Sequence, residues 1–234
     1  NVQRLISEPT AAAFAYEISK NNNNSVSLIV DLGGGTFDIS MVKSTGNNLD
    51  AFSVIATLGD RELGGDDFTN KIVEYIINSI QKENDNFNLN PSIQNLLREE
   101  AVKAKHELSF KEQVEVNFPM LPTFDNKIFS HSISITQDDL KEISSEIIQK
   151  ISNLIREFLE IDKVKKQIIS KVVCVGGASR MPLFLKTIED LTNLKPQIDI
   201  NPDEVISHGA AYCAEYTLSD LVKKTIIDVT PLSL

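Results

Sequence analysis

The stretch DLGGGTFD, residues 31–38, places three consecutive glycines between two aspartates, directly after the apolar stretch SVSLIV. Glycines carry no Cβ atom, so their backbone N–H groups can point into one concavity and approach an anion closely. Flanking strands would bring Asp31 and Asp38 beside that concavity, where carboxylate oxygens suit hydrated Mg²⁺. Thr36 adds a hydroxyl donor. The residues alone leave two interpretations open, a phosphate cradle and a plain glycine turn.

Apolar patterning around this stretch predicts an antiparallel meander. Residues 26–32 form a short apolar run, residues 37–41 alternate apolar with polar, and residues 52–56 do the same. DLGGGTFD would be the first hairpin turn of these three strands. Upstream, SEPTAAAFAYEISK combines a capping residue, a first-turn proline and strong helix formers, which predicts a helix over residues 8–20.

A second glycine site lies in VVCVGGASRMP, residues 172–182. A buried strand over residues 171–175 would end in Gly176 and Gly177, with a helix from Ser179 to Leu191. Ligands of open α/β folds collect at the carboxyl ends of strands, and a helix N-terminus there favours phosphate or ribose. The planar guanidinium of Arg180 could stack on a purine. A simple tight turn remains the alternative. Another helix is expected over residues 201–216, so this part alternates strand and helix.

The segment between these glycine sites has a different hydrophobic pattern and is expected to be an inserted subdomain. Its periodicity predicts helices over residues 66–81 and 92–109 and strands over residues 114–120 and 127–135. One long helix should then start near Thr136 and return the chain to the main body. Lys105 and Ser109 share one face of the second helix. Taken without the other motifs, this pattern indicates only a solvated helix face. His131 and His208 have no evident partner and are assigned no role.

Composition excludes some classes of function. The net charge is −10, with 33 acidic and 23 basic residues and no basic stripe, which argues against nucleic acid binding. No apolar run approaches the roughly 18 to 20 residues of a membrane span. Cys174 and Cys213 lack any metal-ligand spacing, so they are expected to be buried free thiols in a reducing compartment. Because the first residue is Asn1, the chain is expected to be a fragment of a longer protein.

Ordered motifs across the chain resemble the ATPase domain of the seventy-kilodalton heat-shock chaperones of the DnaK type. They are RLISEPTAAAFAY, DLGGGTFD, LGGDDF, AKHELS, VGGASRMP, INPDEVISHGAA and DVTPLSL. The resemblance implies an α/β fold, the second lobe of an actin-like, ribonuclease H-like ATPase. Residues 1–63 and 144–219 would be its inner subdomain and residues 64–143 an inserted α+β outer subdomain. Residues 220–234 would be the interdomain linker and the start of the substrate-binding domain.

The resemblance also implies roles for individual residues. Asp31 matches the aspartate that organises metal-bound water, Asp38 matches the one near the potassium and metal ions, and both are expected to be catalytic together with Glu8. The implied cofactors are ATP or ADP, Mg²⁺ and K⁺. The residues implied to hold the nucleotide form a phosphate loop, a hinge-side loop, a clasp on the outer subdomain and an adenosine-binding turn: Gly33, Gly34, Gly35, Thr36, Gly64, Gly65, Lys105, His106, Ser109, Gly176, Gly177, Arg180 and Asp203.

Other residues match positions that connect the ATPase to its partners. Glu8 and Pro9 resemble the pair that couples the catalytic centre to the linker. Arg4 and Asp228 resemble the surface used by J-domain co-chaperones. The implied function is an ATP-dependent chaperone that binds and releases unfolded client peptides, with an exchange factor on the outer subdomain, no nucleic acid and no membrane. The expected location is the cytoplasm or, alternatively, an organelle lumen such as the mitochondrial one.

The chain departs from the family pattern at several places. Val102 stands where the family usually has a glutamate, His106 where it often has arginine or a hydrophobic residue, and Ala178–Ser179 where it has Ser-Thr. The linker reads KKTIIDV in place of a leucine run. Two alternatives follow, a co-chaperone-binding module that has lost hydrolysis, and a sugar kinase or filament ATPase of the same fold. LISEPTAAA and DVTPLSL favour the chaperone. The isolated lobe is expected to be catalytically incompetent, because the first phosphate loop and a catalytic lysine would lie in the other lobe.

Overall fold

A six-stranded mixed sheet carries the glycine hairpin. In the computed structural model, which describes residues 5–20, 24–45, 51–218 and 225–227, the strand order is β7-β6-β1-β2-β3-β8. In this order β1, β2 and β3 are neighbours and pair in antiparallel fashion, which confirms the predicted meander. The other three each pair in parallel with a neighbour. The strands are β1 (Val26–Leu32), β2 (Phe37–Thr45), β3 (Ala51–Asp60), β6 (Lys171–Val175), β7 (Pro196–Gln197) and β8 (Thr225–Ile227).

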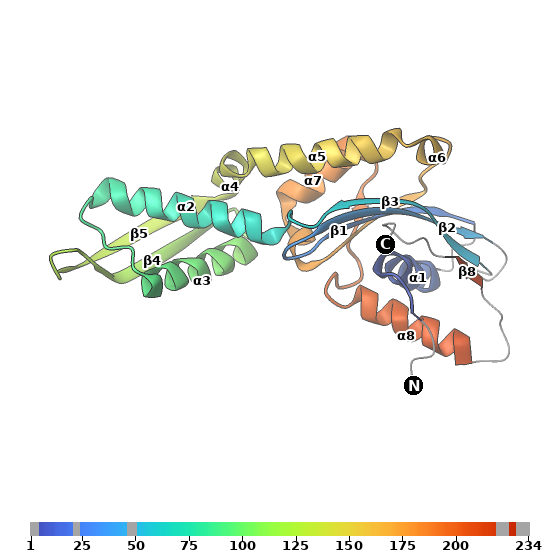
Figure 1. Ribbon diagram of the computed structural model, residues 1–234, viewed down its shortest axis with the longest axis horizontal. Coiled ribbons are helices and arrows are strands. Elements are labelled where there is room, and N and C mark those ends of the chain that lie inside the picture. The colour runs from blue at the N-terminus through green and yellow to red at the C-terminus, as the bar shows by residue number, and fades with distance from the viewer. Residues whose placement is uncertain (1–4, 21–23, 46–50, 219–224, 228–234) are drawn as a thin grey trace. The chain divides into compact units, whose positions relative to one another are not determined.

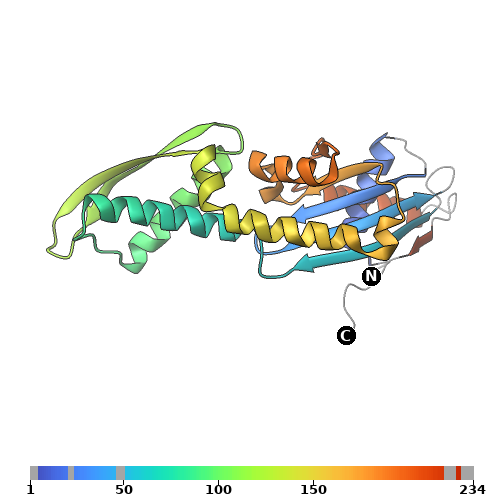
Figure 2. The same cartoon turned by 90° about the horizontal axis from the view of Figure 1, so that it is seen from above.

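Helices cover both faces of this sheet. On one face lie α1 (Glu8–Lys20) and α8 (Val205–Leu218), with α1 between the sheet and α8 (Figure 1). The other face carries α7 (Pro182–Thr192) and the part of α5 (Ser145–Glu160) that follows Lys150, as Figure 2 shows from above. The short α6 (Asp162–Lys165) leads from α5 towards β6. The meander and these alternating strands and helices give the α/β layers that the sequence predicted.

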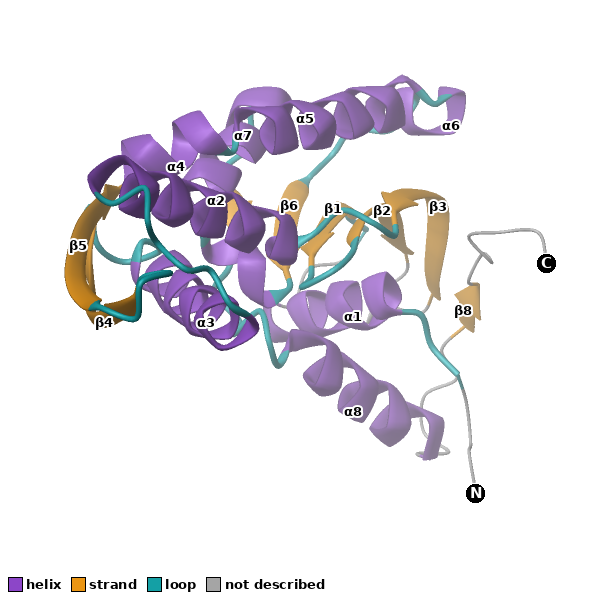
Figure 3. Ribbon diagram, turned by 60° about the vertical axis from the view of Figure 1, so that its left-hand side comes forward, coloured by secondary structure: helices purple, strands orange, loops and turns teal. Residues whose placement is uncertain are grey.

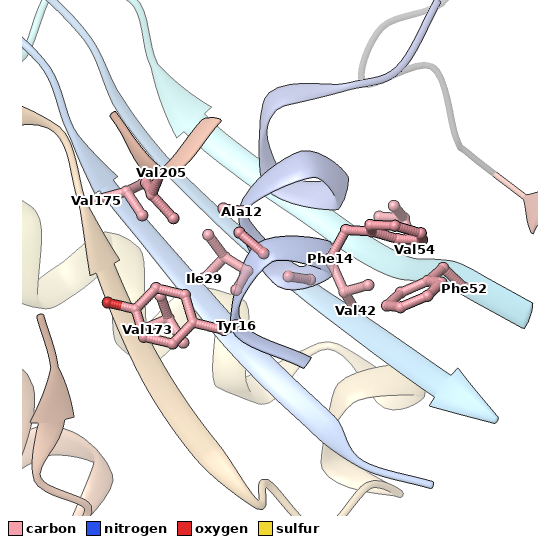
Figure 4. Packing of buried hydrophobic residues seen from close by; sticks show 12 residues of the cluster. Ala12, Phe14, Tyr16, Ile29, Val42, Phe52, Val54, Val173, Val175 and Val205 are labelled. Atoms are coloured by element: carbon pink, nitrogen blue, oxygen red, sulfur yellow. The ribbon is translucent and has the colours of Figure 1, made fainter. Parts of the chain in front are cut away.

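Small and aromatic side chains on α1 let it pack tightly on the sheet. Ala12, Phe14 and Tyr16 are fully buried and point towards strand residues such as Ile29 and Val173 (Figure 4). On its other side α1 meets α8 so closely that a Cβ at Gly209 would lie 1.8 Å from the Ala11 carbonyl oxygen. This close approach is possible because the facing residues, Ala11 and Gly209, are small.

The chain divides into two compact units. The first comprises Asn1–Gly64, Lys150–Arg180 and Phe184–Leu234 and contains the sheet. The second comprises Gly65–Gln149 and Met181–Leu183. In the second unit α2 (Gly65–Glu83) and α3 (Pro91–Glu107) pack beside the hairpin of β4 (Gln113–Pro122) and β5 (Ile128–Thr136), which α4 (Gln137–Ile143) follows (Figure 3). The sequence-based division into inner and outer subdomains and a linker stays a prediction.

The single long helix predicted from Thr136 is wrong, because the chain forms α4 and α5 with a break at Ser144. Thr136 does cap α4 through a reciprocal bond pair with Asp139. Ser144 has φ −102° and ψ 10°, and its buried hydroxyl lacks a hydrogen-bond partner in the described part of the chain. Serine is a weak helix former, but the Ile148 N–H still bonds the Ser144 carbonyl at 3.0 Å. The apolar periodicity of the sequence continues through the break, so the pattern alone does not indicate that the helix is interrupted.

Two other predicted helices begin later than expected. Residues 177–180 form a 3₁₀ turn, and α7 begins only at Pro182, because proline lacks the N–H that a helix interior requires and disfavours helical geometry before it. After Asn201 the chain first makes a turn, in which the Asn201 carbonyl accepts from Glu204 and Val205, and α8 begins at Val205.

Two further observations bear on the class of protein. Cys174 and Cys213 are buried thiols, as expected. Among the helices of the described ranges, none combines the length and the apolar character needed to cross a membrane.

Candidate functional site

The two aspartates of DLGGGTFD face each other across the hairpin. Asp31 at the end of β1 pairs directly with Asp38 in β2. The turn between them is closed by the Gly33 N–H, which donates to the Thr36 carbonyl at 3.0 Å. Asp31 is half-buried, whereas Asp38 is exposed. The predicted placement of two carboxylates beside one glycine turn is therefore observed.

Negative charge accumulates at this end of the hairpin. Burial raises the pKa of Asp31 to about 6, and the nearby carboxylates of Glu8 and Asp38 add to the effect. Loss of hydration and the charge of Glu8 also raise the pKa of Asp38, while a hydrogen bond from Thr36 and the charge of Arg61 oppose this. Glu8 is exposed and begins α1. Its charge contributes to the raised pKa of both aspartates. Three carboxylates in one region favour the binding of a cation.

The glycines of the turn are not required by the fold. A Cβ at Gly34 or Gly35 would meet no atom within 4 Å, and one at Gly33 would make only ordinary contacts. None of the three has a positive φ. In the described part of the chain, no acceptor bonds the N–H groups of Gly34 and Gly35. The turn therefore keeps two unbonded N–H donors at positions that carry no side chain.

Two further glycines let neighbouring backbone pack against the hairpin. A Cβ at Gly64 would lie 2.4 Å from the Gly34 carbonyl oxygen, and one at Gly59 would lie 2.4 Å from Asp38 Oδ1. Gly64 was predicted for this site, whereas Gly59 was missed. Its signal was present in the sequence as an isolated glycine near the end of a strand, which often marks a close backbone approach.

The second glycine site lies directly against the first. Gly176 has φ 83°, and a Cβ there would lie 2.4 Å from the Leu32 carbonyl oxygen and 2.5 Å from Asp31 Oδ1. This contact follows from the parallel pairing of β6 with β1, in which Val175 lies opposite Asp31. The two motifs, residues 31–38 and 172–182, therefore meet at the carboxyl ends of adjacent strands.

Arg180 is held beside this turn by the segment that precedes α8. Its guanidinium donates to Asn201 Oδ1 and forms an ion pair with Asp203 at 2.7 Å. A Cβ at Gly177 would lie 2.9 Å from Asp203 Oδ1. The turn expected to bind adenosine is thus a pair of glycines, one of them left-handed, with a fixed arginine at its edge.

In the second unit, Lys105 is tied to α2. It is buried, and its ammonium group donates to the Gly65 carbonyl at 2.6 Å and to Thr69 Oγ1 at 2.8 Å. Burial lowers the pKa of Lys105, partly offset by the charge of Asp66. Its ammonium therefore fastens α3 to the first turn of α2.

The remaining predicted clasp residues lie at or after the end of α3. His106 is exposed, and Ser109 is half-buried, with its hydroxyl 3.5 Å from the Lys105 carbonyl. On the flank of α3 a cavity of about 580 Å³ is lined by Asn95, Arg98, Glu99, Val102 and Lys103. Val102, one of the positions that depart from the family pattern, therefore lines this cavity.

The prediction that assigned His131 no partner is wrong. His131 is buried, with Nε2 3.1 Å from the Ser79 hydroxyl and Nδ1 bonded to the Glu83 carboxylate. Because its partners lie 48 and 52 residues earlier in the chain, only the packing of β5 against α2 reveals them. His208 lies 3.8 Å from Glu204 on the surface of α8.

The donor set at the hairpin suits magnesium held through water. Within the described ranges, no three His, Cys, Asp or Glu side chains converge closely enough to hold a metal ion by themselves. Magnesium usually keeps several waters and binds through one or two carboxylates and the phosphates of a substrate. Asp31 and Asp38, beside a turn with two unbonded N–H donors, provide such a pair.

Of the residues predicted for coupling, Pro9 lies half-buried in the first turn of α1. Arg4 and Asp228 lie outside the described residues. The described segment nearest to Asp228 is β8, which adds a parallel strand to the edge of the sheet, with Ile226 opposite Phe52.

Comparisons with known proteins agree with the resemblance. The family model described as Hsp70 protein matches residues 1–234. The chain is also 38% identical over 235 residues to a chaperone protein dnaK from Guillardia theta. That alignment covers 100% of this chain and 37% of the relative, so the chain spans little more than a third of the relative's length.

Proposed function

Because the chain belongs to the Hsp70 family, we propose that it forms the second lobe of an ATPase domain that drives a molecular chaperone. The ATPase domain of this family has an actin-like fold, and the mixed sheet with helices on both faces is consistent with that fold. The activity belongs to a full-length protein with a first lobe and a domain for unfolded client peptides.

The hairpin carries this proposal. Its glycines have neither a positive φ nor a crowded Cβ position, and they leave two N–H donors without an acceptor between paired aspartates. A phosphate chain held there would gain hydrogen bonds from the backbone, and the glycines would present no side chain to block its approach. We assign Gly33, Gly34, Gly35 and Thr36 to the phosphates and Gly64 to the supporting hinge-side loop.

Asp31 and Asp38 would hold magnesium through water, with potassium beside Asp38, and Glu8 adds to the charge that attracts these cations. Bound magnesium neutralises charge on the phosphates. The raised pKa of Asp31 suits a carboxylate that accepts a hydrogen bond from a water molecule and orients it, because the pKa near 6 still leaves it ionised at neutral pH.

Adenosine would lie against the second glycine site, where Gly176 and Gly177 expose the backbone and Asp203 fixes the guanidinium of Arg180. From the second unit we assign Gly65, Lys105, His106 and Ser109 to the same ligand. For Lys105 the assignment is indirect, since its ammonium is bonded to α2 and would shape the clasp.

A packed route runs from the carboxylates to the edge of the sheet. Glu8 and Pro9 begin α1, and further along α1 the ring of Phe14 packs on Phe52 of β3 with centroids 4.6 Å apart. Phe52 in turn pairs with Ile226 of β8. We propose that β8 belongs to the interdomain linker and that its docking on β3 transmits the state of the nucleotide to the client-binding domain. The parallel backbone pairing of β8 with β3 supports this docking.

Partners follow from the same proposal. We expect a J-domain co-chaperone at a surface that includes Arg4 and Asp228, and a nucleotide-exchange factor on the second unit. We expect the protein to work in the cytoplasm or, alternatively, in an organelle lumen.

The test is ATP hydrolysis by the full-length protein and by its Asp31→Asn variant. We expect slow turnover in the wild type, turnover reduced at least about a hundredfold in the variant because a water-orienting group is lost, and binding of MgATP in both, measured by calorimetry. We expect the isolated 234-residue chain to show negligible turnover.

Absence of hydrolysis in the wild-type full-length protein, with intact MgATP binding, would instead support a co-chaperone-binding module. The apolar Val102 in the cavity on α3 is the observation that favours this second function. Steady turnover by the isolated chain at the full-length rate would contradict the proposal that this chain is an incomplete ATPase.

A further inference from the structure

Arg61 lies at the open end of the glycine hairpin. The register of β2 and β3 pairs Asp38 with Gly59 and Phe37 with Asp60. Arg61 is the next residue after this last pair, so the chain places it beside Thr36, at the edge of the turn that carries the two unbonded N–H groups. Nothing in the sequence pattern singled out this residue.

The segment that contains Arg61 is packed against the turn. At its far end Gly64 lies so close to Gly34 that a Cβ would approach the Gly34 carbonyl oxygen to 2.4 Å. At its near end Gly59 lies against the Asp38 carboxylate. Arg61 is therefore anchored on both sides to the backbone of the hairpin, within the same compact unit.

The guanidinium of Arg61 is available for a ligand. Arg61 is exposed, and within the described residues its guanidinium makes no hydrogen bond or ion pair. The other arginines in the described ranges are each bonded: Arg98 to Asn70 and Asp66, Arg156 to Asn153, and Arg180 to Asn201 and Asp203. The charge of Arg61 also lowers the pKa of Asp38, which agrees with its position on this side of the hairpin.

We infer that Arg61 is a phosphate-binding residue, which contacts the terminal phosphate of a nucleotide whose phosphate chain lies on residues 33–36. The inference rests on the proposed function and adds a residue to it. A guanidinium presents a planar fork of N–H donors that matches two phosphate oxygens, and it stays charged at any physiological pH. In a region where Glu8, Asp31 and Asp38 accumulate negative charge, a local cation offsets repulsion of the incoming phosphates.

The experiment compares MgATP and MgADP binding by calorimetry in the full-length protein and in its Arg61→Ala and Arg61→Lys variants. Lys43→Ala is the matched control, because Lys43 is an exposed cation on the same sheet, opposite Val26 at the other end of β2. It changes the net charge equally and lies outside residues 31–38, which form the turn and its two aspartates. Thermal unfolding of each variant checks that the fold is intact.

We expect Arg61→Ala to weaken MgATP binding about tenfold or more, the loss typical of one hydrogen bond between charged groups. MgADP binding should change less, Arg61→Lys should lose only part of the affinity, and Lys43→Ala should change neither. The salt dependence of MgATP affinity should become shallower in Arg61→Ala.

Equal MgATP affinity in Arg61→Ala and the wild type would overturn the role of Arg61 and leave the proposed function standing. An equal loss of MgATP affinity in Arg61→Ala and Lys43→Ala would also overturn the role of Arg61, because the loss would then reflect the change in net charge alone. No binding of MgATP by the wild-type protein would overturn both proposals.

Discussion

The two glycine sites of this chain use glycine for opposite reasons. At residues 33–35 the backbone has ordinary φ values, and added Cβ atoms would find open space or ordinary contacts. At Gly176 the backbone is left-handed, and a Cβ would collide with Leu32 and Asp31. Glycine at position 176 is therefore a requirement of the fold. Glycine in the hairpin has no such explanation, and this difference points to a ligand at the hairpin.

The comparison also explains why Asp31 has an unusual environment. Because Gly176 lacks a side chain, the turn after β6 closes against the Asp31 carboxylate, which is half-buried between the two sites. Asp38, on the hairpin side alone, stays exposed. Asp31 thus belongs to both glycine sites. Substitutions at Gly176, at Asp31 and in the hairpin can therefore separate effects on folding from effects on binding.

The largest expected effect is on folding, from Gly176→Ala. An alanine at φ 83° is strained, and its Cβ would displace the end of β1. We expect a loss of about 3 kcal/mol in the free energy of unfolding, measured by urea denaturation. A loss below about 1 kcal/mol would show that the turn can rearrange and would remove the contrast between the two sites.

Asp31→Asn should stabilise the protein at neutral pH. Burial and the charges of Glu8 and Asp38 raise the pKa of Asp31 from 3.8 to about 6, so its protonated form is favoured by folding. That contribution is fully present below about pH 4 and is lost as the pH rises through about 6. The variant should therefore gain roughly 2 kcal/mol over the wild type at pH 7.5 and little at pH 4. Denaturation curves at both pH values measure this, and a pH-independent difference would contradict it.

Replacing Gly34 and Gly35 together by alanine should affect binding and spare the fold. Both Cβ positions are open, so we expect the free energy of unfolding to stay within about 0.5 kcal/mol of the wild type. The added methyl groups would stand between the N–H donors and a phosphate, so MgATP affinity should fall about tenfold or more. Calorimetry and denaturation on the same full-length sample separate the two effects. Unchanged MgATP affinity would argue for a plain turn.

The smallest expected effect is that of Asp203→Ala on stability. The ion pair between Asp203 and Arg180 is exposed, and such pairs contribute about 0.5 kcal/mol. We expect a loss of that size, with a further weakening of MgADP binding because Arg180 is no longer held at the adenosine side. Asp203→Asn, which can still accept a hydrogen bond, is the control. A stability loss above about 2 kcal/mol would place this pair with Gly176 among the requirements of the fold.

Much of the fold could be predicted from local pattern. The helix over residues 8–20 and the strands over residues 26–32 and 171–175 were predicted with the observed bounds, because proline, glycine and apolar runs mark their ends. The break at Ser144 was missed, because apolar periodicity continues through it. The start of α7 could have been placed at Pro182, since proline is excluded from a helix interior.

The sequence by itself determined the type of site and most of its residues: paired aspartates around three glycines, a second glycine turn and motifs that identify the family. Only the tertiary structure decided which of these residues meet. It placed Gly59 against Asp38 and Gly176 against Asp31, turned Lys105 towards α2, paired His131 with Ser79 and Glu83, and left Arg61 unbonded beside the hairpin. The physical reason is that backbone propensity and hydrophobic periodicity act over a few neighbouring residues, whereas these contacts arise from strand register and close packing between distant segments.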